Sequence, residues 1–207
     1  ASDVYKRQMV YGGTGREELQ LNEETFWAGG PYDNNNTNAL YVLPVVRNLI
    51  FQGKTREAQR LVDANFLARK DGMSYLTMGS LFLDFPGHEE ATDFYRDLNI
   101  EDATATTRYK VDGVTYTRRV FASFTDSVIV VRLTTPGHKG KLNFSLRMQD
   151  GRQGMTRVDG HTMTIKGTLD LLSYEAQALL QADGGMVETK SDRLEVKGAD
   201  AVTVVLT

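Results

Sequence analysis

The residues best suited to chemistry in this sequence lie in one polar segment, residues 22–36 (NEETFWAGGPYDNNN). Trp27, the only tryptophan of the chain, stands there among Asn, Thr, Gly and Pro residues. An indole ring offers an apolar plane to a pyranose, and Asn22 and Thr25 could hydrogen-bond to hydroxyl groups. A tryptophan in such a loop can equally pack beneath the loop itself or against a neighbouring domain. The segment is therefore a candidate surface for binding either a sugar or another domain.

The same segment carries two carboxylates, Glu23 and Glu24. A pair of carboxylates is the usual machinery of glycoside hydrolysis. Adjacent side chains of an extended segment point to opposite faces, however, so this spacing does not predict a catalytic pair. Both residues also fit ordinary surface charges, and no Ser-His-Asp arrangement follows from the sequence.

Two further motifs resemble known sites but lack essential residues. The glycine-rich stretch at residues 12–15 (GGTG) has neither the Lys nor the following helix of a phosphate-binding loop, so it predicts a tight turn. His88 precedes two glutamates, but a zinc protease helix needs a second His where Thr92 stands. We interpret the acidic residues between 89 and 93 as a solvated turn, and we expect no metal and no cofactor.

Composition excludes several classes of function. The chain has 207 residues, of which 41% are hydrophobic and 25% charged, with a formal net charge of −3. Without a basic patch, nucleic-acid binding has no electrostatic support. No apolar run reaches the roughly 18–20 residues of a membrane span, so we expect no membrane partner. The absence of cysteine excludes disulfides and thiol chemistry but leaves the cellular compartment unknown.

Both ends of the chain are unusual. Residues 1–8 (ASDVYKRQ) lack an initiator Met and share no pattern with the rest of the chain, and we interpret them as a non-native leader before a domain at residues 9–207. The final residues, 201–207 (AVTVVLT), form an apolar β-branched run with no turn after it. We therefore expect a chain truncated at both ends, whose last strand lacks its continuation and leaves an open edge.

Hydrophobic periodicity predicts a short helical insertion at residues 37–67. Pro44 suits the first turn of a helix, and Val46, Leu49 and Ile50 follow at helical spacing. Gly53 suits the end of that helix. Apolar residues at 58, 61 and 62 continue a second stripe, so we predict two short helices joined near Gly53.

From residue 81 onward the period changes to two, which predicts strands. Asp-Gly pairs at 112–113 and 159–160 stand between β-forming residues, which is a strong hairpin signal. The run at 127–133 suits a buried strand, whereas residues 172–180 alternate less cleanly. Many strands spaced by turns predict a mainly β fold, a large antiparallel β-sandwich carrying the two-helix insertion.

The sequence resembles the N-terminal region of glycoside hydrolase family 95, the inverting α-L-fucosidases. The likeness runs in order through residues 9–207. The blocks that carry it are 19–31 (LQLNEETFWAGGP), 43–50 (LPVVRNLI), 78–88 (MGSLFLDFPGH), 109–118 (YKVDGVTYTR), 120–123 (VFAS), 128–133 (VIVVRL) and 198–202 (GADAV).

The resemblance implies a large N-terminal β-sandwich followed by a linker, an (α/α)6 barrel and a C-terminal β domain. It places the catalytic groups in the barrel, so no catalytic residue is carried over to this chain. The implied partners are that barrel and, in the intact enzyme, a fucosylated glycan. Asn22, Glu23, Thr25 and Trp27 then become candidates for a loop that faces the barrel or the substrate. A carbohydrate-binding module and the same domain of an α-L-galactoside hydrolase are the alternatives.

Overall fold

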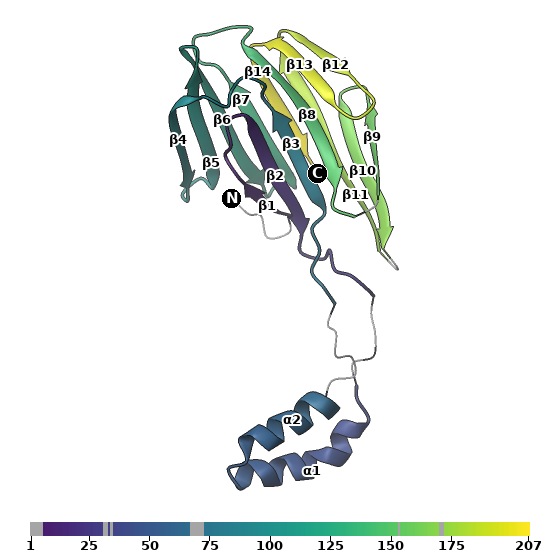
Figure 1. Ribbon diagram of the computed structural model, residues 1–207. Coiled ribbons are helices and arrows are strands. Elements are labelled where there is room, and N and C mark those ends of the chain that lie inside the picture. The colour runs from purple at the N-terminus through teal and green to yellow at the C-terminus, as the bar shows by residue number, and fades with distance from the viewer. Residues whose placement is uncertain (1–5, 31–32, 34, 67–72, 153, 170–171) are drawn as a thin grey trace. The chain divides into compact units, whose positions relative to one another are not determined.

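The structure is a computed structural model that describes residues 6–30, 33, 35–66, 73–152, 154–169 and 172–207. The chain divides into two compact units (Figure 1). We call Ala1–Trp27 with Tyr75–Thr207 the sandwich unit, and Ala28–Ser74 the helical unit.

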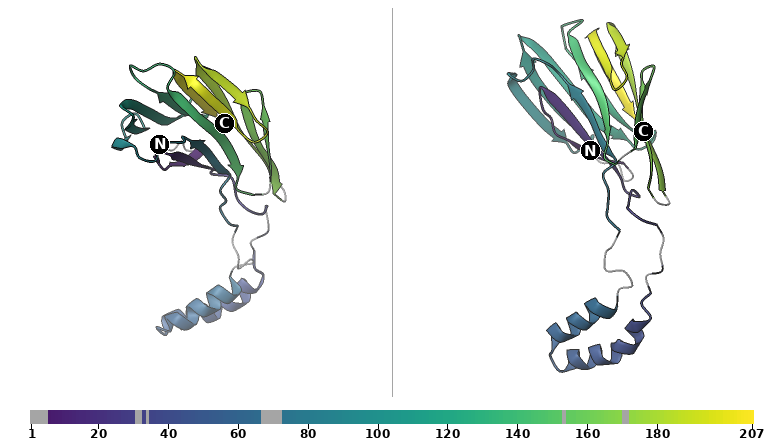
Figure 2. Two further views of the ribbon diagram at one scale, coloured as in Figure 1. Left: turned by 45° about the horizontal axis from the view of Figure 1, so that its top comes forward. Right: turned by 45° about the vertical axis from the view of Figure 1, so that its right-hand side comes forward.

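The sandwich unit consists of two antiparallel sheets that lie face to face (Figures 1 and 2). The six-stranded sheet has the order β1 (Lys6–Val10), β2 (Arg16–Glu23), β3 (Gly79–Asp84), β8 (Leu142–Asp150), β13 (Leu194–Ala199) and β12 (Met186–Thr189). The eight-stranded sheet has the order β4 (Thr92–Asn99), β5 (Thr104–Val111), β6 (Val114–Ser123), β7 (Val128–Thr134), β14 (Ala201–Leu206), β11 (Leu172–Asp183), β10 (Thr162–Leu169) and β9 (Met155–Asp159).

The core follows from alternation along these strands. In β3, Leu81 and Leu83 are fully buried, and the alternate residues Ser80, Phe82 and Asp84 are only half-buried. Strand β11 alternates just as regularly, although two of its inward residues are the small Ala176 and Ala178, which weakened the pattern in the sequence. Full burial of one large apolar side chain stabilises a fold by about 1.5–3 kcal/mol, so the interior between the sheets holds the unit together. The predicted mainly β sandwich is confirmed.

The Asp-Gly turns form the predicted hairpins. Asp112 and Gly113 both adopt positive φ, 49° and 75°, as a tight two-residue hairpin turn requires. They join β5 to β6, and Gly160 lies in the turn that joins β9 to β10. A local two-residue signal therefore fixed two of the strand pairings.

The last strand, β14, corrects one expectation. It pairs with β7 on one side and with β11 on the other, so it lies inside the eight-stranded sheet. Its side chains Val202 and Val204 are fully buried. The expected open edge at the end of the chain is therefore wrong, because the sheet closes around this strand from earlier parts of the sequence.

The first strand, β1, begins at Lys6 and pairs with β2, so that Gln8 faces Leu21. Three residues of the expected leader thus belong to a strand by their backbone pairing, and residues 1–5 lie outside the described residues. That residues 1–8 are a non-native leader stays a prediction.

Strand β4 was not predicted. All eight of its side chains are exposed, and it forms an edge of the eight-stranded sheet. Its register shifts between Thr92 and Tyr95, where Asp93 has a φ of 51°. A bulged strand with no buried face has no period-two hydrophobic pattern, so nothing in its sequence marked it.

The helical unit contains α1 (Asn38–Phe51) and α2 (Thr55–Asn65), which pack against each other. The predicted two-helix insertion is confirmed, and Gly53, with a φ of 74°, lies in the turn between the helices. Pro44 does not stand in the first turn as expected but is the seventh residue of α1. The helix begins earlier, with Thr37 as its N-cap, and just before it Asn36 Oδ1 accepts a hydrogen bond from the backbone N–H of Asn38 at 3.0 Å. Neither described helix is long and apolar enough to cross a bilayer.

Candidate functional site

The segment that follows β2 is fixed to the sandwich by backbone pairing with the segment before β3. Leu76 N–H donates to the carbonyl of Phe26 at 3.0 Å, and Trp27 forms a bridge with Tyr75. Phe26 is 2% exposed, and its ring meets that of Tyr174 edge-on at 4.9 Å between centroids. Because Phe26 anchors the segment in the core, its neighbour Trp27 is directed outward.

Trp27 and Tyr75 form an exposed aromatic pair. Their ring centroids are 4.9 Å apart at an interplanar angle of 51°, and the residues are 41% and 39% exposed. The indole Nε1–H donates to the carbonyl of Glu24 at 2.7 Å. Since this bond satisfies the polar edge of the indole and fixes its orientation, the accessible part of the ring is apolar surface.

The polar residues of the segment order one another. Asn22 Oδ1 accepts the N–H of Glu23 at 2.9 Å. Glu23 Oε2 accepts both the N–H of Thr25, at 2.8 Å, and its hydroxyl. A shallow hollow beside the aromatic pair is lined by Glu24, Thr25, Trp27 and Tyr75. This combination of an apolar ring, a hydroxyl and a carboxylate suits either a sugar or a partly polar protein surface.

The structure thus places the residues predicted from the sequence in one small region and adds Tyr75, which sequence reasoning missed. Trp27 and Thr25 line the hollow, whereas Asn22 and Glu23 support the turn beneath it. Tyr75 stands 48 positions after Trp27, beyond the helical unit, so no local pattern connected the two residues. Trp27 therefore finds an aromatic partner within this chain.

A second cluster of ionisable residues lies inside the sandwich. Glu17 and Arg118 are buried, and Arg118 Nη2 lies 2.7 Å from Glu17 Oε2. Glu17 Oε1 accepts the N–H of Gly12 at 2.7 Å, and Arg118 donates to the carbonyl of Gly13 at 2.6 Å. The ion pair therefore holds the glycine-rich turn that the sequence predicted. Burial is the largest influence on Glu17 and raises its pKa, although Arg118 opposes the shift.

His88, which is 7% exposed, belongs to the same interior. Its Nδ1 lies 3.0 Å from the hydroxyl of Tyr109, and its ring meets that of Tyr116 edge-on at 4.5 Å. Loss of solvent lowers the pKa of His88 and raises the pKa of Tyr109 to about 12. The neighbours Glu89 and Glu90 are exposed, as expected. Because the cluster is closed to solvent, it supports the fold and offers a substrate no access.

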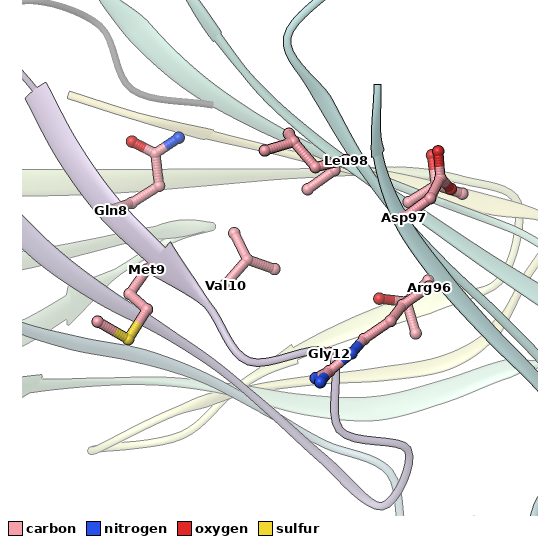
Figure 3. A pocket seen from close by; sticks show the side chains of 10 residues that line it. Gln8, Met9, Val10, Gly12, Arg96, Asp97 and Leu98 are labelled. Carbon is pink, nitrogen blue, oxygen red and sulfur yellow. The ribbon is translucent and has the colours of Figure 1, made fainter. Parts of the chain in front are cut away.

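A third feature is a hollow of about 500 Å³ between β1 and the β4–β5 pair (Figure 3). Val10 and Leu98 point into it from the two sides, whereas Met9 points away. Arg96, at its end, is engaged with the carbonyl of Tyr11 at 2.7 Å. The hollow is an opening between two sheet edges without a convergent set of polar groups, so Trp27 and its neighbours remain the better candidate. Among the described residues, no cluster of three or more acidic or histidine side chains is placed to hold a metal ion.

Comparisons with known proteins show what this chain is similar to. Residues 8–207 match the family model described as glycosyl hydrolase family 65, N-terminal domain. Alpha-L-fucosidase 2 of Arabidopsis thaliana is 33% identical over 140 residues, which are 66% of this chain and 16% of the relative. Probable alpha-fucosidase A of Aspergillus oryzae is 27% identical over 142 residues, which are 65% of this chain and 19% of the relative. A solved structure described as a putative kojibiose phosphorylase from human microbiome aligns with all of this chain and 32% of its own, at a TM-score of 0.41 and 6% identity.

The match thus covers less than a fifth of the length of these two curated relatives. The expectation of a glycoside hydrolase N-terminal domain is confirmed by the family model, which includes all but the first seven residues. The chain belongs to the family of glycosyl hydrolase family 65 N-terminal domains.

Proposed function

We propose that this chain is the N-terminal domain of an inverting α-L-fucosidase of glycoside hydrolase family 95. The full-length enzyme would hydrolyse terminal α-linked L-fucose from glycans. The observation that carries the proposal is the 33% identity to a relative named Alpha-L-fucosidase 2 across 66% of this chain. The blocks of sequence typical of family 95 lie on strands of both sheets, on α1 and in the segment around Trp27.

In this proposal the chemistry takes place outside the sandwich. An inverting glycosidase needs a general acid and a base-activated water, with the two carboxyl groups about 6.5–9.5 Å apart in a cleft. Among the described residues, the acidic side chain most deeply buried is Glu17, which is paired with Arg118 and closed to solvent. The catalytic groups would therefore reside in an (α/α)6 barrel of the same polypeptide, and the sandwich would brace that barrel.

The segment with Asn22, Glu23, Thr25 and Trp27 would face the barrel near the mouth of its cleft. Two exposed rings in contact, with the indole N–H already bonded, form an ordered apolar surface that gains by being covered. Covering the exposed part of Trp27 and Tyr75 would stabilise the junction by about 1–2 kcal/mol. Thr25, beside these rings, could bond to the barrel or to a substrate hydroxyl.

One observation favours a second candidate, a carbohydrate-binding module. The hollow of Glu24, Thr25, Trp27 and Tyr75 has the composition of a small sugar site. A module of this kind would bind fucosylated glycans without any other domain. The same N-terminal domain in an α-L-galactoside hydrolase is the remaining alternative on the enzyme side.

The experiment is a substrate panel for the full-length protein. Aryl α-L-fucoside, aryl α-L-galactoside and 2′-fucosyllactose are incubated with the enzyme, and the anomer of the released sugar is followed by proton NMR. The proposal expects fucose to be released first as the β-anomer. Preference for the galactoside would assign the alternative substrate, release of the α-anomer would contradict inversion, and glycan binding without release would favour the module.

A further inference from the structure

The two helices of the helical unit have very different outer faces. The faces that meet are apolar, and Val46 of α1 and Ala58 of α2 are both only 4% exposed. The remaining surface of α2 is charged and polar, as expected for a helix in water. The remaining surface of α1 is not, since Arg47 is the only charged residue in the helix.

The exposed side of α1 is uncharged and largely apolar, with Asn48 as the one polar side chain among its apolar residues. We call it the α1 outer face. On a helical wheel Leu40, Tyr41, Pro44 and Phe51 lie opposite to Val46, and Val45 lies at the border of this group. The side chains Leu40, Tyr41, Val45 and Phe51 are 74%, 79%, 51% and 87% exposed. The members of the α1 outer face are Leu40, Tyr41, Pro44, Val45 and Phe51.

A helix that is apolar on both sides belongs between two layers of a structure. The hairpin supplies one layer, α2, and the described residues of the helical unit supply no second layer. Two helices of 14 and 11 residues are also marginal by themselves in water, and Pro44 removes one backbone hydrogen bond from α1. An exposed apolar face on so short a hairpin would therefore gain stability from being covered.

We propose that the α1 outer face is covered by the catalytic domain of the same polypeptide, an inference that rests on the proposed function. The curated relatives extend far beyond the matched region, which is only 16% and 19% of their lengths. The α1 outer face carries no charge, so it fits an equally uncharged apolar patch on the partner and not an anionic one.

The size of the face also favours a partner within the same chain. Five side chains on one helix offer far less than the ~800 Å² per partner of a stable bimolecular interface. A domain joined by a linker is present at an effective concentration in the millimolar range, so a small contact is enough to hold it. A second copy of the chain has no such advantage.

The experiment is photo-crosslinking in the full-length protein. Tyr41→p-benzoylphenylalanine places a reactive aromatic ketone of similar shape on the α1 outer face, and Arg60→p-benzoylphenylalanine on the exposed side of α2 is the control. The proposal expects crosslinks from position 41, and few from position 60, to peptides located after residue 207 of the same molecule. Crosslinks from position 41 to residues 1–207 or to a second copy, or a yield no higher than the control, would overturn it.

A second pair of variants covers the case in which the probe disturbs the site. The double variant Tyr41→Glu with Val45→Lys places a Glu and a Lys four positions apart on α1. If the α1 outer face is uncovered, this pair stabilises the helix. Arg60→Glu with Ala64→Lys is the matched change on the exposed side of α2. In the full-length protein we expect the α1 variant to speed amide hydrogen exchange of residues 38–51 about tenfold or more, with little effect of the α2 variant. Equal or slower exchange would overturn the proposal, and neither readout depends on which substrate the enzyme uses.

Discussion

Glu17 and Arg118 form an ion pair between the two sheets, with 2.7 Å from Glu17 Oε2 to Arg118 Nη2 and side chains that are 0% and 3% exposed. Glu17 lies on β2 of the six-stranded sheet and Arg118 on β6 of the eight-stranded sheet. The pair also binds the backbone of Gly12 and Gly13. It therefore joins both layers of the sandwich and the glycine-rich turn in one polar network.

Removing one partner of this pair should be costly. Arg118→Met leaves the Glu17 carboxylate buried without a counter-charge, which typically destabilises a protein by about 3–5 kcal/mol. Arg132→Met is the matched control, because Arg132 pairs with Asp183 at the surface, where such a pair is worth about 0–1 kcal/mol. Urea denaturation of this chain measures the free energy of unfolding of both variants. The double variant Arg118→Met with Glu17→Gln should recover part of the lost free energy of unfolding. If Arg118→Met and Arg132→Met lower the free energy of unfolding equally, the role given to the pair is contradicted.

Stability should fall in mild acid because of His88. Burial lowers its pKa from 6.5, so the unfolded state takes up this proton first as the pH falls. The contribution of neutral His88 is therefore complete above about pH 6.5 and is lost as the pH falls toward the folded-state value. His88→Gln should remove this part of the pH dependence, whereas His138→Gln, at an exposed position, should keep it. Identical pH profiles of the free energy of unfolding for the two variants would refute the assignment.

The β5–β6 turn should tolerate few residues at position 113. A Cβ added to Gly113 meets no atom within 4 Å, so only its φ of 75° opposes a side chain. Gly113→Val should lower the free energy of unfolding by about 1–2 kcal/mol. Gly113→Asn should lower it less, because Asn adopts positive φ more readily. Urea denaturation of the two variants provides the comparison. If Val and Asn cost the same, backbone strain is not what selects glycine here.

Local signals in the sequence predicted much of this fold, and long-range contacts account for what they did not predict. Each Asp-Gly hairpin turn, and the alternation in β3, depends on residues that are only a few positions apart in the sequence. The partnership of Glu17 with Arg118 spans 101 positions and has no local pattern. His88 is followed in the sequence by two acidic residues, whereas its neighbours in space are Tyr109 and Tyr116, which no local pattern indicates.

In the candidate site, too, local sequence predicted some residues, and a long-range contact supplied another. The composition around Trp27 marked the segment, and the structure places that indole at the surface. Tyr75 could not be inferred, because the helical unit separates it from Trp27 in the sequence. The period-two alternation from residue 81 onward predicted the sandwich. The edge strand β4 could not be predicted in this way, because all of its side chains are exposed.

Trp27→Ala distinguishes two roles for the segment in the full-length enzyme. If the indole braces the junction, Tm should fall while the kinetics of the folded fraction stay unchanged, because the contact of about 1–2 kcal/mol is lost. If the indole contacts substrate, kcat/KM should fall at unchanged Tm. Phe94→Ala, at a half-exposed aromatic residue on β4, is the control. No change in either quantity would show that the segment has neither role.

The most direct test of the proposed function compares the full-length protein with residues 9–207 in the same assay. Both are incubated with 2′-fucosyllactose and an aryl α-L-fucoside after circular dichroism has shown that the shorter chain contains β-structure. We predict that the full-length protein releases fucose and that residues 9–207 release none. Fucose release by residues 9–207 that survives further purification, or no release by the full-length protein, would contradict the proposed function.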